Sequence, residues 1–151
     1  MRKITKKMTV FLVDDDADDR LIFSKAIERV AEACTVVQFR DGLEAIEAVK
    51  KEENLASLPD IIFLDVNMPV IDGIETLAII RNELKLYDQP IAMYSTSRVE
   101  ADMTNALVAG ANVYIKKPSK MADLTEVLCK VLNAVIQYHD TFEMKTFVLS
   151  V

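Results

Sequence analysis

The chain has 151 residues, of which 51% are hydrophobic and 28% are charged, and its formal net charge is -6. This length fits one domain, and the apolar content can fill a core, which excludes a wholly disordered chain. The negative charge excludes a general nucleic-acid binder, because such proteins need clustered Lys and Arg to neutralise phosphates.

The remaining composition points to a soluble cytoplasmic protein. Cys34 and Cys129 lie far apart among apolar neighbours, which favours buried thiols over a disulfide framework or a metal knuckle. No long apolar run follows the basic N-terminus, so the sequence predicts neither a secretory signal nor a membrane span.

Apolar runs alternate with segments of helical periodicity in the first half of the chain. The run from Met8 to Val13 stops at three consecutive aspartates and is typical of a buried strand. From Ala17 to about Ala33 the apolar residues recur at helical spacing. A β-branched run at 35–39 predicts a second strand, and the helix that begins at Asp41 is expected to reach about Glu53.

The second half repeats the alternation. Strands are expected at 60–65, 91–94 and 113–115, and helices after Asp72, after Ser97 and from about Lys120 to Tyr138. Asp72 and Ser97 are each followed three residues later by Glu, which is the pattern of a capping box. Five strands alternating with five helices predict a doubly wound α/β domain with a mainly parallel sheet.

The domain organisation predicted from this pattern is simple. Residues 1–7 are an N-terminal extension, 8–139 form the domain, and 140–151 form a C-terminal tail. The tail is too apolar to be idle in solvent. We expect it to pack on the domain or against a second copy in a homodimer.

Polar side chains gather where the predicted strands end. Asp14 and Asp15 follow the first strand, Asp65 ends the third, Ser95 follows the fourth and Lys117 follows the fifth. In an open parallel sheet, these carboxyl ends form the usual ligand site. Carboxylates that converge there repel one another unless a cation neutralises them, and oxygen ligands favour Mg²⁺. Asp65 is then the candidate nucleophile for phosphoryl transfer, with Lys117 to offset charge and Ser95 to donate a hydrogen bond.

These motifs resemble the receiver domain of response regulators, including the single-domain chemotaxis regulators, over residues 8 to about 139. The resemblance rests on VFLVDD at 10–15, IFLDVNMP at 62–69, DG at 72–73, ST at 95–96, GA at 110–111 and YIKKP at 114–118. It implies the flavodoxin-like receiver fold, with five parallel strands in the order 2-1-3-4-5.

The resemblance also implies a role for each site residue. It makes Asp65 the phosphoacceptor, Lys117 its basic partner, and Ser95 and Tyr114 the switch residues. The implied ligands of Mg²⁺ are Asp14, Asp15, Asp65 and the backbone carbonyl of Asn67; no organic cofactor is expected. The sequence leaves open whether Asp16, Asp18 or Asp19 contribute, since the helix dipole alone explains Asp18 and Asp19.

The implied partners are a histidine kinase, hybrid kinase or phosphotransfer protein, and a downstream protein target. Nucleic acid and membrane are not expected partners. The domain would catalyse only its own phosphorylation and dephosphorylation, so it is not expected to be an enzyme. Two alternatives remain at this point. One is a degenerate receiver that docks partners without phosphorylation, and the other is an aspartate-nucleophile phosphatase, which usually has a second acid where Asn67 stands.

Overall fold

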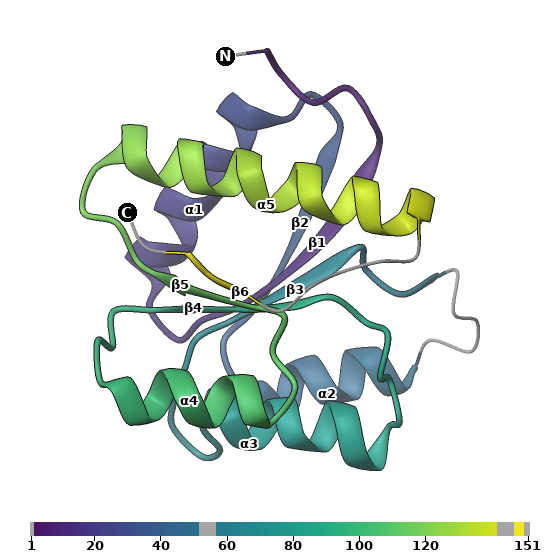
Figure 1. Cartoon of the computed structure of the whole chain (residues 1–151), viewed down its shortest axis with the longest axis vertical. Coiled ribbons are helices and arrows are strands. Elements are labelled where there is room, and N and C mark those ends of the chain that lie inside the picture. The colour runs from purple at the N-terminus through teal and green to yellow at the C-terminus, as the bar shows by residue number, and fades with distance from the viewer. Residues whose placement is uncertain (1, 52–56, 142–146, 150–151) are drawn as a thin grey trace.

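The computed structural model describes residues 2–51, 57–141 and 147–149. A parallel sheet in the order β2-β1-β3-β4-β5-β6 forms its middle layer. Helices α1 and α5 cover one face, and α2, α3 and α4 cover the other (Figure 1). The strands are β1 (Met8–Val13), β2 (Cys34–Phe39), β3 (Ile61–Leu64), β4 (Ile91–Ser95), β5 (Val113–Lys116) and β6 (Phe147–Leu149). The helices are α1 (Ala17–Val30), α2 (Gly42–Lys50), α3 (Gly73–Ala78), α4 (Glu100–Val108) and α5 (Met121–Thr141), with a π-helical turn, η2 (Ile79–Glu83), after α3.

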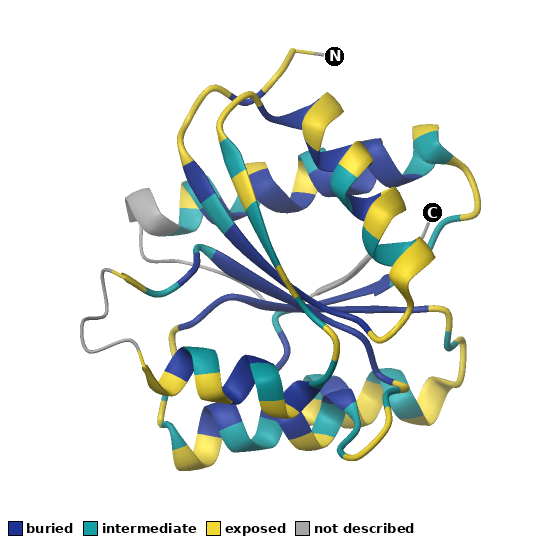
Figure 2. Cartoon of the chain, turned by 180° about the vertical axis from the view of Figure 1, so that it is seen from behind, coloured by how far each residue is buried: buried dark blue, intermediate teal, exposed yellow. Residues whose placement is uncertain are grey.

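The inner strands are buried because helices cover both of their faces. Every residue of β3 and β4 is buried, and Figure 2 shows these strands as a dark band between the two helical layers. On the face covered by α1 and α5, the ring of Phe23 from α1 packs edge-on against two rings of the sheet. Its centroid lies 5.0 Å from that of Phe63 and 5.5 Å from that of Tyr94. Leu77 and Met93 belong to the core on the other face. No helix in the described ranges is both long enough and apolar enough to cross a membrane.

The predicted order 2-1-3-4-5 is confirmed, and the tail adds a strand that the sequence analysis did not predict. Phe147–Leu149 pairs in parallel with β5, so the sheet has six strands rather than five. Three residues are too few to give a recognisable strand pattern. Residues 142–146 and 150–151 of the tail lie outside the described residues, and the contact with a second copy stays a prediction.

Three helix ends differ from the sequence-based expectation. Helix α1 ends at Val30, before the predicted end near Ala33. Helix α2 ends at Lys50, before the predicted end near Glu53, and residues 52–56 lie outside the described residues. Helix α5 continues to Thr141, past the predicted end at Tyr138.

The turn between β3 and α3 holds Asp65 close to the start of a helix. The amide of Gly73 donates to the carbonyl of Val66 at 2.8 Å. The carboxylate of Asp72 accepts from the amide of Glu75 at 2.8 Å, which confirms the predicted cap. A Cβ atom on residue 73 would overlap the backbone carbonyl of Asp65. Glycine is therefore needed here because the helix approaches the end of β3 so closely.

Replacing Gly73 with alanine is expected to destabilise the fold by about 1–3 kcal/mol, because the added methyl group forces α3 away from the end of β3. Urea unfolding followed by circular dichroism measures the loss. Glu75→Ala, at an exposed position of the same helix, is the control and should have a much smaller effect. A G73A midpoint equal to that of the wild type would show that the close approach is not tightly packed.

Candidate functional site

Strand register brings the predicted site residues together at one edge of the sheet. In the β1–β3 pairing Val13 lies opposite Leu64, so Asp14 and Asp65 follow side by side. The amide of Asp65 donates to the carbonyl of Val13 at 3.0 Å. In the same way the amide of Lys117 donates to the carbonyl of Ser95 at 2.8 Å. Asp14, Asp65, Ser95 and Lys117 therefore meet because they lie at the ends of strands that are parallel and in register.

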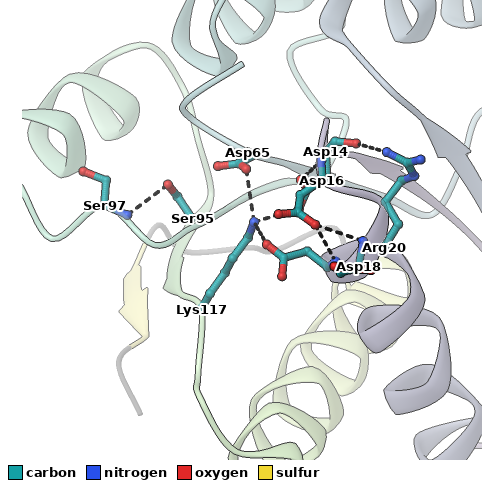
Figure 3. Close-up of polar contacts among 9 residues, drawn as sticks. Asp14, Asp16, Asp18, Arg20, Asp65, Ser95, Ser97 and Lys117 are labelled. Atoms are coloured by element: carbon teal, nitrogen blue, oxygen red, sulfur yellow. Dashed lines mark hydrogen bonds and ion pairs between the residues drawn. The ribbon is translucent and has the colours of Figure 1, made fainter. Parts of the chain in front are cut away.

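The ammonium group of Lys117 lies among three carboxylates. Its Nζ atom is 2.8 Å from Oδ2 of Asp14, 2.8 Å from Oδ2 of Asp19 and 3.1 Å from Oδ2 of Asp65. Figure 3 shows the Lys117 side chain extending from its strand end toward Asp14 and Asp65. An ammonium group has three N–H donors, so these contacts use its full capacity.

Burial makes these charges depend on one another. The side chain of Asp14 is fully buried, and those of Lys117 and Asp65 are 8% and 10% exposed. Burial raises the pKa of Asp14, while its hydrogen bonds to Lys117 and to the amide of Asp16 oppose that rise. Burial alone would lower the pKa of Lys117, but its hydrogen bonds to Asp14 and Asp19 raise it above its ordinary value. The group thus holds a charged lysine at neutral pH.

A second set of three aspartates, which includes Asp15 in place of Asp19, could hold a metal ion. Asp14, Asp15 and Asp65 can each offer a carboxylate oxygen, and these oxygens lie within 4.8 Å of one another. A hard divalent cation such as Mg²⁺ takes this kind of oxygen ligand. Asp15 is exposed and Asp14 buried, so one side of the cluster faces solvent. The donor set fits the predicted Mg²⁺ site.

The predicted switch residues lie on one side of this cluster, at the end of β4 and in β5. Ser95 is fully buried, and its Oγ atom accepts a hydrogen bond from the amide of Ser97 at 3.1 Å (Figure 3). Tyr114 is also fully buried, and its hydroxyl donates to the carbonyl of Ser97 at 3.0 Å. Burial raises the pKa of Tyr114. Both side chains are thus joined to one residue of the loop before α4.

This arrangement can be compared with known proteins. Residues 10–129, well over half of the chain, match the family model described as the response regulator receiver domain. The chain belongs to this family. The receiver domain is 34% identical over 125 residues to the chemotaxis protein CheY homolog of Campylobacter jejuni, covering 83% of this chain and 92% of that relative. It is 27% identical over 136 residues to hybrid signal transduction histidine kinase G of Dictyostelium discoideum, of which it spans only 4%.

Solved structures show the same fold. The phosphorylated cyanobacterial phytochrome response regulator RcpA is 30% identical, with a TM-score of 0.75 and coverage of 87% of this chain and 95% of the other. The Mn²⁺-bound form of response regulator Rcp1 is 27% identical, with a TM-score of 0.70 and coverage of 82% and 91%.

The structure of this receiver domain adds Asp19 to the residues that meet at the site. From the sequence it was left open whether Asp19 contributes, because the helix dipole is a sufficient explanation for an acid in this turn. Asp16 caps α1, because its carboxylate accepts from the amides of Asp18 and Asp19 at 2.9 Å and 3.1 Å. The first turn then carries Asp19 to Lys117. Recognising Asp16 as the cap of this helix would have placed Asp19 in the first turn, close to the strand ends.

The predicted cap at Ser97 is wrong. Helix α4 begins at Glu100, after Val99. The backbone of Ser97 is held in the loop by hydrogen bonds with the side chains of Ser95 and Tyr114. Its hydroxyl accepts from the amide of Val99 at 3.3 Å, still within the loop, and donates to the carboxylate of Asp102 at 2.6 Å.

Replacing Lys117 with methionine is expected to destabilise the metal-free domain by about 3–5 kcal/mol, because it leaves buried carboxylates without their cation. Urea unfolding in EDTA measures the change. The double variant Asp14→Asn with Lys117→Met also removes one of the unpaired carboxylate charges. It should therefore lose less stability than Lys117→Met alone. Equal losses in the two variants would mean that lost packing, not charge, sets the cost.

Proposed function

We propose that this receiver domain accepts a phosphoryl group on Asp65 from a histidine kinase, hybrid kinase or phosphotransfer protein, and signals through the resulting change of conformation. The observation that carries the proposal is the contact between Lys117 and Asp65, at 3.1 Å, beside two further acids able to hold a metal ion. Such a set offers a nucleophile, a cation for the phosphoryl oxygens and metal ligands in one place.

In the proposed reaction an oxygen of Asp65 attacks the phosphorus of a phosphohistidine. The O–P bond forms as the P–N bond breaks, and the phosphohistidine ring, protonated on its other nitrogen, leaves with the electron pair as neutral imidazole. Lys117 stays within reach to offset charge on the phosphoryl oxygens. Asp14, Asp15, Asp65 and the exposed Asn67, through its backbone carbonyl, would hold Mg²⁺, which when bound supplies further positive charge at those oxygens.

Known relatives support this proposal. The phosphorylated RcpA and the Mn²⁺-bound Rcp1 share the fold at 30% and 27% identity. The likeness to the chemotaxis protein CheY homolog, 92% of which is covered, supports a role as a response regulator. We propose that the domain acts as a single-domain regulator on a protein target in the cytoplasm. The phosphatase alternative lacks support, because Asn67 stands where such enzymes usually carry a second acid. We therefore propose that the domain catalyses only its own phosphorylation and dephosphorylation.

Loss of the phosphoacceptor tests the proposal directly. Asp65→Asn is expected to abolish formation of an acyl phosphate from acetyl phosphate with Mg²⁺, because an amide is not a competent nucleophile. Intact-protein mass spectrometry detects the added phosphoryl group. Asp88→Asn, in an exposed loop, is the control and should load normally. Retained labelling of the D65N variant would reject Asp65 as the acceptor.

We further propose that the new charge on Asp65 draws the hydroxyl of Ser95 away from the amide of Ser97. Because Tyr114 binds the carbonyl of that same residue, the loop before α4 and the tyrosine would shift together. The surface formed by α4, β5 and α5 would carry the change to a protein target.

Ser95→Ala is expected to separate phosphorylation from this response. Beryllofluoride, which imitates the acyl phosphate, should still bind at Asp65 but move the amide resonances of Ser97 and Tyr114 less than in the wild type. Two-dimensional ¹H–¹⁵N NMR measures both. Ser119→Ala, which removes an exposed hydroxyl, should respond as the wild type does. Full shifts at Ser97 in the S95A variant would rule out the proposed relay.

A further inference from the structure

We infer that Asp19 is a positioning residue that holds Lys117 in the unphosphorylated site and gives it up to a phosphoryl oxygen when Asp65 is loaded. Asp19 thereby slows loading, which here means the transfer of a phosphoryl group to Asp65. The inference rests on the proposed function of Asp65, and it adds a regulator of that reaction on helix α1.

The contact with Asp19 is as close as any that Lys117 makes. The Nζ atom is 2.8 Å from Asp19, the same as from Asp14, and closer than the 3.1 Å to Asp65. With three donors and three carboxylate acceptors, Lys117 has no N–H left for a newcomer. A phosphoryl oxygen on Asp65 can gain a hydrogen bond from Lys117 only if one present acceptor is released.

Burial decides which acceptor is released most easily. Asp14 is fully buried, so separating it from Lys117 would leave a desolvated carboxylate without its cation, a costly state. Asp65 stays an anion until its O–P bond forms, so it keeps its contact with Lys117 while the phosphoryl donor approaches. The side chain of Asp19 is 32% exposed, so water can replace the lost hydrogen bond. Asp19 is therefore the acceptor that exchanges.

The start of α1 explains why Asp19 is available for this role. In a capping box the Glu or Gln three residues after the cap reaches back to the amide of the capping residue, and Asp19 occupies that position here. Here the amide of Asp16 already donates to Oδ1 of Asp14 at 2.9 Å. Asp19 has therefore no need to turn back to the cap, and its carboxylate reaches Lys117 instead.

Two effects of Asp19 act against loading. It occupies one donor of the lysine that the phosphoryl group needs, and it adds a negative charge where an anionic phosphoryl donor must approach. Asp19→Asn keeps the size of the side chain but removes the charge. Since a partly exposed ion pair is weak, we expect the loading rate to rise by about two- to fivefold.

Loading of the full chain from phosphoramidate in saturating Mg²⁺ tests the inference. In this reaction Asp65 attacks phosphorus, the O–P bond forms, the P–N bond breaks, and ammonia leaves with the electron pair from the N-protonated donor. Rates are measured by mass spectrometry over a range of donor concentrations. Asp19→Asn should load faster than the wild type, whereas Asp19→Glu, which keeps the charge, should stay near it.

Asp18→Asn is the matched control, since it removes the same charge from the neighbouring exposed position of the same helical turn. It should load at close to the wild-type rate, because Asp18 is not a partner of Lys117 among the described contacts. Loading of D19N no faster than that of the wild type or of D18N would overturn the inference, as would fast loading of D19E. A wild type that forms no acyl phosphate would instead reject the proposed function itself.

Discussion

The contact of one ammonium group with three carboxylates is the constraint on which this receiver domain depends. Two carboxylates about 4 Å apart repel by roughly 4 kcal/mol at an effective dielectric constant near 20. Lys117 contacts both Asp14 and Asp65 and so offsets the repulsion between these two buried carboxylates. The same arrangement keeps a cation ready where a phosphoryl group would arrive. The charge of Lys117 therefore serves both the stability of the fold and the proposed phosphoryl transfer.

Strand register is what delivers that side chain. Lys117 is 103 residues from Asp14, 98 from Asp19 and 52 from Asp65 in sequence, so no local structure can bring them together. Three parallel strands do so by ending at one edge of the sheet. A slip of one residue in any of them would turn its terminal side chain to the opposite face. The tightly packed turn at Gly73 fixes the end of β3 in the same way.

Much of this arrangement could be predicted from the sequence, because strand ends are marked by abrupt changes from apolar to acidic residues. Asp14 and Asp65 stand at such changes, and the order of the first five strands followed from the alternation and the family resemblance. Asp19 could not be assigned, because an acid in a first helical turn has a sufficient local explanation. The wrong cap at Ser97 has a related cause. The sequence pattern was local, whereas the hydrogen bond from Tyr114 that holds Ser97 in the loop comes from a distant strand.

The sixth strand has a consequence for the solubility of the domain. Without it, β5 would be the edge of the sheet, and its Val113-Tyr114-Ile115 segment would present unpaired amides and carbonyls to other chains. Backbone pairing with Phe147–Leu149 satisfies that edge within the molecule. The new edge is only three residues long, and short edge strands are poor templates for intermolecular sheets. The pairing of Phe147–Leu149 with β5 therefore leaves a shorter template for aggregation on the side of the domain that carries Tyr114.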